Sequence, residues 1–215
     1  MTLPLALQGR IFIARHGETV FNAAKRMQGD QLDTPLTRTG FAQAEAMGEA
    51  LAQWLGTRQT LSLWSSPSGR ALQTLAVIAE HIGGDWHSAT HDARLQEIDV
   101  GDWAGRTYAE IMAEQGSILD PHVALFSIRP PGGEWYDDIA ARLQSWIDDT
   151  AGQRGDRLVI MHGMSSRVLR GMLLGLDVDP VWKAPIAPSL PQGTMVMVGN
   201  GEEKVIRLGG GTQLA

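Results

Sequence analysis

The sequence contains no cysteine, and this absence excludes a disulfide scaffold, a thiolate nucleophile and any metal site with cysteine ligands. It also has no apolar run close to the roughly 20 residues that a membrane-spanning helix needs. The first nine residues are apolar, but they lack the basic start and the cleavage site of a signal peptide. We therefore expect no membrane association and a location in the reducing cytoplasm.

Positive charge is also scarce, because 18 lysines and arginines face 24 aspartates and glutamates and leave a net charge of −6. A broad nucleic-acid surface requires net positive charge, so we expect no nucleic-acid partner. A hydrophobic fraction of 43% and a charged fraction of 20% are typical of a folded globular chain. The length fits a single domain over residues 1–215, and the composition leaves a homo-oligomer open.

Short apolar runs alternate with segments of helical periodicity along the chain. The apolar stretches are typical of buried parallel strands and cover residues 11–14, 61–64 and 158–161. Apolar residues at helical spacing predict helices over residues 39–55, from Ser66-Pro67 to Ile82, over residues 134–150 and from residue 163 onward. In the second of these helices we expect Ser66 as the N-cap and Pro67 in the first helical position.

The C-terminal part of the sequence has a different pattern. Residues 195–198 and 205–208 flank Asn200-Gly201, a dipeptide that favours a hairpin turn. Strand–helix alternation that ends in a hairpin indicates an α/β fold, namely a three-layer α/β/α sandwich with a mostly parallel central sheet and an antiparallel edge. Periodicity fades over residues 100–135, so we expect a short inserted lid there. Gly209–Gly211 predicts a flexible tail.

Polar side chains follow each of the three predicted parallel strands at the point where the strand ends. Arg15-His16 follow the first strand, residues 65–70 with Arg70 follow the second, and His162-Gly163 follow the third. Because ligands bind outside the carboxyl ends of the strands in open α/β sheets, we expect these residues to converge on one site.

Two arginines and two histidines at one site of an acidic chain indicate a binding site for a phosphate group. Arginine binds phosphate oxygens with a rigid, bidentate fork, and helix N-termini after Gly17 and at Ser66-Pro67 would add backbone N–H donors. A neutral histidine can act as a nucleophile that forms a covalent intermediate. The cationic side chains neutralise the transferred group, so this chemistry needs no metal or other cofactor.

The segment Arg15-His16-Gly17-Glu18-Thr19, followed by Asn22, resembles the signature of the histidine phosphatase superfamily, which has the phosphoglycerate mutase-like fold. Further blocks resemble the family's other motifs in matching order over about residues 10–175. These blocks are Gln28-Gly29 with Pro35-Leu36-Thr37, Ser65-Ser66-Pro67 with Arg70-Ala71, Leu95-Gln96-Glu97 with Gly101, Trp103 and Gly105, and Met161-His162-Gly163.

The resemblance implies a metal-independent phosphatase of the family's small branch, acting on a small-molecule phosphomonoester without a cofactor. His16 would be the nucleophile that becomes phosphorylated, and Glu97 would protonate the leaving alcohol and then activate water. Arg15, Arg70 and a protonated His162 would hold the phosphoryl oxygens. The remaining residues that would help to bind the substrate are Thr19, Asn22, Gln28 and Gly163.

The sequence departs from the family pattern in the lid. Trp135 follows Gly132-Gly133-Glu134 at a position where many small phosphatases of this group have serine. The lid is shorter than in the mutases, and no basic cluster resembles the one that holds a bisphosphate there, which favours a phosphatase. Mutase-type phosphoryl transfer and a non-catalytic module that binds phospho-ligands stay open as alternatives. We expect Trp103 and Trp135 at the pocket entrance, and His122 is a further lid residue that could contact substrate.

Two other enzyme classes are disfavoured. Gly163-Met164-Ser165 opens a predicted helix as a serine nucleophile elbow does, but that elbow requires a histidine later in the chain. All six histidines precede Ser165. No His-Glu-x-x-His motif supports a metallohydrolase.

Overall fold

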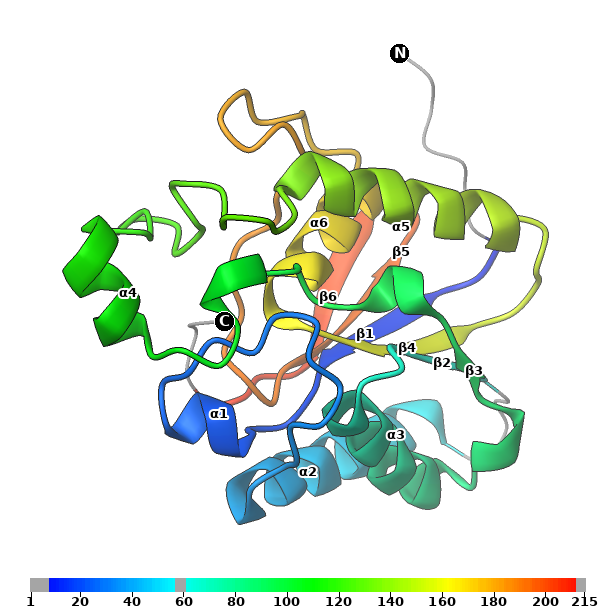
Figure 1. Cartoon of the computed structure of the whole chain (residues 1–215). Helices are drawn as coiled ribbons and strands as arrows, with labels where there is room; N and C mark the ends of the chain where they lie inside the picture. Colours follow the sequence, from blue (N-terminus) through cyan, green and yellow to red (C-terminus); the bar gives the residue numbers. More distant parts are fainter. Residues whose placement is uncertain (1–7, 57–60, 212–215) are drawn as a thin grey trace.

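The computed structural model describes residues 8–56 and 61–211 of the chain. In these residues six strands form one sheet with the order β3-β2-β4-β1-β5-β6 (Figure 1). β1 to β4 are mutually parallel, whereas β5 runs antiparallel to β1 and β6 antiparallel to β5. The mostly parallel sheet with an antiparallel edge is therefore confirmed. The strands are β1 (Ile11–Arg15), β2 (Ser62–Ser65), β3 (Thr90–His91), β4 (Arg157–Met161), β5 (Met195–Gly199) and β6 (Glu202–Arg207).

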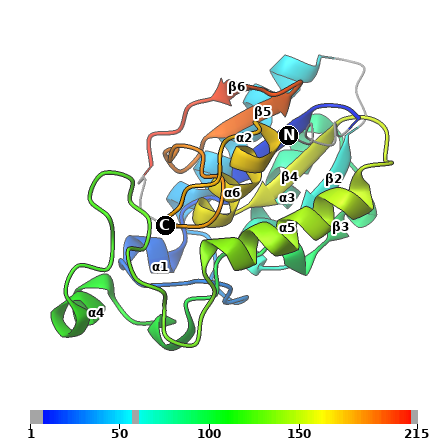
Figure 2. The ribbon, with the colours of Figure 1, turned by 90° about the horizontal axis from the view of Figure 1, so that it is seen from above.

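Helices cover both faces of the sheet, which gives the molecule three layers (Figures 1 and 2). α2 and α3 pack on one face, and α5 and α6 pack on the other. Within residues 8–56 and 61–211, none of the helices has the length and apolar character that crossing a bilayer requires. The helices are α1 (Val20–Ala23), α2 (Arg38–Leu55), α3 (Gly69–Ile82), α4 (Tyr108–Gln115), α5 (Tyr136–Thr150) and α6 (Gly163–Leu173).

The alternation of side chains along the strands divides the core into two halves. Phe12 and Ala14 of β1 pack with α2 and α3, whereas Ile11 and Ile13 pack with α5 and α6. All four side chains are at most 2% exposed. Burial on both faces explains why β1 and β4 are continuous apolar runs in the sequence rather than alternating ones.

The strand order brings the carboxyl ends of β1, β2 and β4 to one edge of the sheet. β4 lies between β1 and β2 and pairs in parallel with both. Just beyond the strands, the His16 N–H donates to the Met161 carbonyl and the Ser66 N–H donates to the Ile160 carbonyl, each over 3.0 Å. The segments that follow the three strands are therefore adjacent, although they are far apart in the sequence.

A close approach of two glycines positions α2 against the end of β1. A Cβ on Gly17 would lie 2.3 Å from the carbonyl oxygen of Gly40, and a Cβ on Gly40 would lie 2.1 Å from that of Glu18. The Thr37 hydroxyl caps α2 by accepting the Gly40 N–H over 3.1 Å. A larger side chain at either glycine would push α2 away from the segment that follows β1.

The segment between Gly101 and Trp135 leaves the layers and extends past the edge where β1 and β4 end (Figure 1). It contains a short 3-10 helix, Gly101–Trp103, and α4. The fading periodicity does not predict α4, but Thr107 and Glu110 form a capping box in which each side chain accepts the other's backbone N–H. This Thr-x-x-Glu pattern is the sequence signal that identifies the helix.

The predicted start of α3 is wrong by two residues. The N-cap is Ser68 rather than Ser66, and the helix begins at Gly69. The Gly69 N–H donates to the Leu32 carbonyl over 2.8 Å, so a contact with a distant loop fixes the first turn. This bond also occupies one of the backbone donors that were expected to bind an anion at this helix end.

The glycine-rich stretch near the C-terminus lies against the protein instead of forming a free tail up to Gly211. The Gly209 N–H donates to the Thr194 hydroxyl over 2.9 Å, and the Gly211 N–H donates to the Gln192 carbonyl over 3.1 Å. A Cβ on Gly209 would lie only 2.2 Å from that same carbonyl oxygen of Gln192. Glycine is needed here for close backbone approach, which the sequence alone does not distinguish from flexibility.

Candidate active site

His16 directly follows β1 and is buried, with 2% of its surface exposed. Its Nδ1 lies 2.7 Å from the Gly17 carbonyl oxygen, so Nδ1 carries the proton and donates to that carbonyl. The lone pair of the ring is then on Nε2. Burial, and then the charges of Arg70 and Arg15, hold the pKa of His16 well below its usual range. The ring is therefore neutral at pH 7, and Nε2 has the lone pair that a nucleophile needs.

His162 follows β4, and its ring lies beside that of His16. The two ring centroids are 5.1 Å apart with an angle of 60° between the planes. Arg70 Nε donates to His162 Nδ1 over 3.3 Å, so the proton of the ring is on Nε2, which lies 3.5 Å from the Ser68 hydroxyl. Burial, and then the charge of Arg70, lowers the pKa of His162 well below its usual range. The expected protonated form of His162 is therefore wrong for this structure, in which the ring accepts a hydrogen bond from a guanidinium.

Arg70 lies at the start of α3 and is completely buried. Its Nη2 donates to the Gly29 carbonyl over 2.6 Å, and its Nη1 donates to the Thr34 hydroxyl over 2.9 Å and to the Gln31 carbonyl. Desolvation by burial lowers the pKa of Arg70 to about 10, which leaves the guanidinium charged at neutral pH. The loop between α1 and α2 thus fixes the plane of this cation next to His162.

Arg15, the last residue of β1, brings a second buried cation to the same place. Burial lowers its pKa, whereas the neighbouring Glu97 and Tyr108 raise it. A Cβ on Gly163 would lie 3.3 Å from Arg15 Cζ and 3.4 Å from Glu97 Oε2. Gly163, which was expected to help bind the substrate, thus lies where this guanidinium and this carboxylate approach the start of α6.

Glu97 is held by three backbone N–H groups. Its Oε2 accepts the Met164 N–H over 3.0 Å, and its Oε1 accepts the N–H groups of Ser165 and Ile98 over 2.9 and 3.0 Å. Two of these donors belong to the first turn of α6, where the helix dipole attracts negative charge. The N-terminus of α6 therefore positions a carboxylate of the protein.

A small pocket joins these groups, with a volume of about 20 Å³. Four of the residues with expected catalytic roles, Arg15, His16, Arg70 and Glu97, line it, together with the expected substrate-binding residue Gln28. His162 is behind this surface, with no exposed area. Among the described residues, no group of three or more His, Asp or Glu side chains is arranged to hold a metal ion.

Thr19 and Asn22 lie beside the pocket and organise its wall. Thr19 is the N-cap of α1 and forms a capping box with Asn22. The Thr19 hydroxyl also donates to Gln28 Oε1 over 2.7 Å. Gln192, which the sequence analysis did not single out, donates from Nε2 to Asn22 Oδ1 over 3.1 Å and to the His16 carbonyl over 3.4 Å. The structure therefore places Gln28 in the pocket wall and Thr19 and Asn22 in the hydrogen-bond network behind it.

The aromatic residues of the lid are arranged differently from the expectation. Trp103 is completely buried and packs edge-on against Phe126 at a centroid distance of 5.4 Å. Trp135 is the N-cap residue of α5, where its N–H donates to Asp138 Oδ2 over 2.8 Å. Tyr108 and Phe126, rather than the two tryptophans, line the catalytic pocket. Trp103 and Tyr108 are both aromatic residues of the lid, so residue type alone does not tell which of them lines the pocket.

Arg142 of α5 is a further residue that the sequence analysis missed. Its side chain donates to the Glu97 carbonyl over 3.3 Å and to the Arg94 carbonyl, and it forms an ion pair with Glu134 at 2.9 Å. The Glu134 carboxylate in turn accepts the Asp99 N–H over 3.1 Å. This network fixes the backbone on both sides of the Glu97 carboxylate.

The two buried histidines predict a stability loss in mild acid. Their pKa values are lower in the folded than in the unfolded protein, so below pH 6.5 the unfolded chain binds more protons. The contribution of the two histidines to the free energy of unfolding is therefore fully present above pH 6.5. It falls as the pH decreases toward the folded-state pKa values, by up to about 1.4 kcal/mol per pH unit for each histidine. Denaturant unfolding between pH 7.5 and 5 measures this slope.

Matched variants show how much of this pH dependence of stability comes from the two buried histidines. Replacing His16 and His162 by asparagine should flatten the slope between pH 6.5 and 5, whereas replacing the exposed His87 should leave it unchanged. A slope that is equally steep in all of these proteins would contradict the assignment of neutral, buried rings.

Comparison with known proteins gives a consistent result over most of the chain. The family model described as histidine phosphatase superfamily (branch 1) matches residues 11–208. Glucosyl-3-phosphoglycerate phosphatase from Mycolicibacterium vanbaalenii is 37% identical over 184 residues, which cover 79% of this chain and 76% of that protein. The probable phosphoglycerate mutase GpmB of Salmonella paratyphi C is 34% identical over 178 residues, which cover 80% of this chain and 77% of that protein.

Solved structures show the same relationship. The native structure of a mycobacterial glucosyl-3-phosphoglycerate phosphatase superimposes with a TM-score of 0.73 at 25% identity and covers 94% of this chain and 99% of that chain. The structure of a mycobacterial glucosyl-3-phosphoglycerate phosphatase with VO3 superimposes with a TM-score of 0.70 at 28% identity and the same coverage. The architecture expected from the sequence is thus also that of these neighbours.

Proposed function

Because the chain belongs to the histidine phosphatase superfamily and is a phosphoric monoester hydrolase, we propose that it acts in two steps through a phosphohistidine on His16. The observation that carries this assignment is the neutral ring of His16, whose Nδ1 proton is bound to the Gly17 carbonyl and whose Nε2 bears the lone pair. The substrate is a small phosphorylated metabolite, and Arg15 and Arg70 surround the transferred group.

The first step requires the protonated form of Glu97, which the second step regenerates: His16 Nε2 attacks phosphorus, the bond between phosphorus and the ester oxygen breaks, and Glu97 gives its proton to the leaving alkoxide. In the second step the Glu97 carboxylate takes a proton from water, the water oxygen attacks phosphorus, and the P–N bond breaks. Inorganic phosphate and neutral His16 are the result. A poor alkoxide leaving group requires such an acid, and the regenerated carboxylate is the base for the water.

The cations around His16 stabilise the phosphoryl group during both steps. Arg15 and Arg70 neutralise the charge on its oxygens, and their buried, fixed positions need no reorganisation during the reaction. A phosphoryl dianion next to Arg70 would raise the pKa of the adjacent His162, since a nearby negative charge favours the protonated ring. The neutral form of His162 in the structure and the protonated form that the resemblance implies then describe the site without and with a bound phosphoryl group.

The alternatives have less support. Among the described residues, the cations that line the catalytic pocket are Arg15 and Arg70, without a lysine, which favours one phosphoryl group over the bisphosphate that a mutase must hold. A binding module would not need the nucleophile or the acid, and both line this pocket. Ser165 is buried, and within the described residues its Oγ has no hydrogen-bond partner to act as a base. The lack of cysteine fits action in the cytoplasm.

Glu97→Gln tests the two-step reaction. The glutamine oxygen can still accept the N–H groups that Oε1 accepts now, but the side chain no longer transfers a proton. p-Nitrophenolate leaves without an acid, so we expect a burst of about one nitrophenolate per site, followed by a steady state slowed about 10²- to 10⁴-fold. With glycerol 3-phosphate no burst should be seen, because the first step also needs the acid.

Two further measurements test for the covalent intermediate and for a metal requirement. Acid-labile, base-stable label from ³²P substrate should accumulate on Glu97→Gln and be absent from the double variant that also carries His16→Ala. Activity of the wild type should persist in EDTA. Hydrolysis without any covalent label, or activity that EDTA removes and metal restores, would contradict the proposed reaction.

A further inference from the structure

A second and larger cavity lies outside the catalytic pocket, between the lid and the loop after α6. Its volume is about 360 Å³, which is in the range of sites for small organic ligands. Residues 122–125 of the lid line one part, residues of the 179–189 loop line another, and Arg167 of α6 also lines it. The catalytic pocket, at about 20 Å³, does not have this room for the organic part of a substrate.

Arg167 is a buried cation in the wall of this cavity, with 5% of its surface exposed. Its Nε donates to the Ala187 carbonyl over 2.9 Å, and its Nη1 donates to the Val123 carbonyl over 2.8 Å. Within residues 8–56 and 61–211 it has no carboxylate partner, and no hydrogen bond of its Nη2 is found. Burial lowers its pKa to about 10, so it is charged at neutral pH. Burying such a charge without a counter-ion is costly.

Two other buried arginines have their charge compensated inside the protein. Arg170, on the same helix, forms an ion pair with Glu203 through hydrogen bonds of 2.6 and 2.8 Å. Arg157 donates to the carbonyls of Thr150 and Gln153, each over 2.7 Å, at the C-terminus of α5, where the helix dipole is negative. The carbonyls that Arg167 binds belong to irregular segments, so no helix dipole balances its charge.

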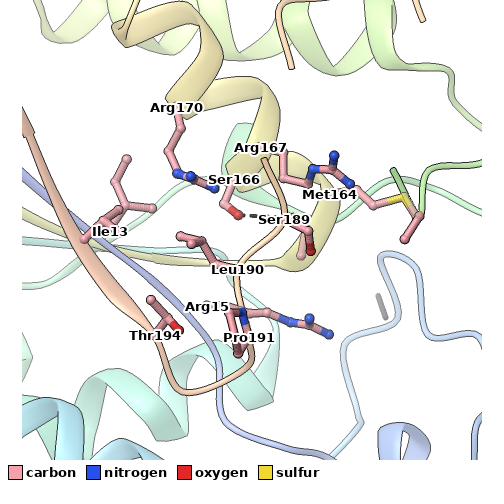
Figure 3. Close-up of a pocket in the computed structure, with 13 residues that line it drawn as sticks. Ile13, Arg15, Met164, Ser166, Arg167, Arg170, Ser189, Leu190, Pro191 and Thr194 are labelled. Carbon is pink, nitrogen blue, oxygen red and sulfur yellow. Dashed lines mark hydrogen bonds between the residues drawn. The ribbon is translucent and has the colours of Figure 1, made fainter. Parts of the chain in front are cut away.

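A further pocket, with a volume of about 20 Å³, borders both the larger cavity and the catalytic pocket. It shares Arg15 with the catalytic pocket and Ala124, Arg167 and Ser189 with the larger cavity. Figure 3 shows the side chain of Arg167 above Ser189 and that of Arg15 below it, both extending toward the same side. Arg15 therefore lies at the border between the catalytic pocket and the pocket that Arg167 also lines.

We propose that Arg167 binds a carboxylate on the organic part of the substrate and thereby determines specificity for phosphorylated acids, an inference that rests on the proposed function of the His16 site. One unpaired guanidinium balances the single charge of a carboxylate better than the double charge of a second phosphate. Asp179 also lines the cavity, but its Oδ1 accepts the N–H groups of Val181 and Trp182 over 2.8 and 3.3 Å. Its negative charge further disfavours a dianion there.

Matched pairs of substrates test this assignment, each pair differing only by a carboxylate in place of a hydroxymethyl group. The pairs are 3-phosphoglycerate with glycerol 3-phosphate, 4-phosphoerythronate with erythritol 4-phosphate, and 6-phosphogluconate with glucitol 6-phosphate. We expect the wild type to prefer the acid in at least one pair. Arg167→Gln should reduce that preference in kcat/KM about 10- to 100-fold, mainly through KM of the acid, as expected for loss of a charge-assisted hydrogen bond.

Three further variants distinguish binding of the substrate carboxylate by Arg167 from a purely structural role, in which Arg167 only joins the two loops through its hydrogen bonds. Arg129→Gln removes the same charge from an exposed lid residue and should not change the preference. Arg167→Lys should restore part of the preference, and Asp179→Asn, which keeps an acceptor oxygen, should increase it. Equal loss on both members of each pair in Arg167→Gln, or no acid preference at any chain length, would overturn the proposal.

Failure of this inference can be told apart from failure of the proposed function. The proposed function fails if the wild type hydrolyses neither these substrates nor p-nitrophenyl phosphate. Calorimetric binding of the three phosphorylated acids to the His16→Ala protein, with and without Arg167→Gln, then tests the Arg167 site without turnover. Weaker binding in the double variant supports it, and equal affinities overturn it.

Discussion

Replacing His16 by alanine is expected to lower kcat by about 10⁴- to 10⁶-fold, because the variant has no group to form the covalent intermediate. The neighbouring cations remain, so binding of inorganic phosphate should weaken by less than about 10-fold. The buried ring of His16 also donates from Nδ1 to the Gly17 carbonyl, so removal of the ring leaves that carbonyl without its hydrogen-bond donor. Steady-state hydrolysis of p-nitrophenyl phosphate and calorimetric titration with phosphate measure the two effects separately.

Controls make this result specific for the nucleophile. The far-ultraviolet circular dichroism spectrum should be unchanged, and His87→Ala, at an exposed position, should retain full activity. Retention of more than about 1% of kcat by His16→Ala would remove His16 from the nucleophile role, and so would a phosphoryl label of undiminished yield on the variant.

Replacing Arg70 by alanine is expected to have the second largest effect, on activity and stability together. The positive charge of the side chain stabilises the phosphoryl group during transfer, so loss of the side chain should lower kcat/KM about 10³-fold or more. The same guanidinium donates to Gly29, Gln31, Thr34 and His162. Each buried acceptor left without its donor costs about 1–3 kcal/mol, so we expect the free energy of unfolding to fall by several kcal/mol.

Arg70→Lys separates the charge from the geometry of the donors. Lysine keeps a positive charge but cannot reproduce the planar fork that binds several carbonyls at once. We expect it to recover little activity, at least about 100-fold below the wild type in kcat/KM. Arg38→Ala, which removes an exposed arginine near the start of α2, is the matched control. An Arg70→Lys protein with near-normal activity would show that charge alone is sufficient at this position.

The convergence of His16 and His162 was predictable because each directly follows a strand that the sequence already shows. Residues 11–14 of β1 and residues 158–161 of β4 are uninterrupted apolar runs, and the polar residues begin where those runs stop. Parallel strands place their carboxyl ends at one edge, which brings His16 and His162 to a ring distance of 5.1 Å. Local pattern and general topology were sufficient for this part of the site.

The lid was less predictable for a physical reason. α4 has only eight residues, too few for periodicity to stand out, and the rest of the segment is held by individual tertiary contacts. Trp103 and Tyr108 are both aromatic residues of this segment, but only the second reaches the catalytic pocket. Such assignments depend on which side of a loop a residue occupies, and no local spacing encodes that.

The start of α3 and the protonation state of His162 also depend on contacts with residues that are distant in the sequence. The Leu32 carbonyl binds the Gly69 N–H and fixes the first turn of the helix. Arg70 donates to His162 Nδ1, and burial removes the water that would stabilise a charged ring. Neither effect is visible in the residues adjacent to the histidine in the chain.

The sequence by itself determined the layered fold and the strand ends that carry the polar groups, since these follow from short-range patterns of apolar and polar residues, whereas the proposed nucleophile role of His16 comes from the family resemblance. Only the tertiary structure decided the tautomers of the two histidines, the attachment of Glu97 to the first turn of α6, and the position of Arg167 in a cavity between two loops. These properties depend on burial and on hydrogen bonds between segments remote in the chain, and both exist only after the chain has folded.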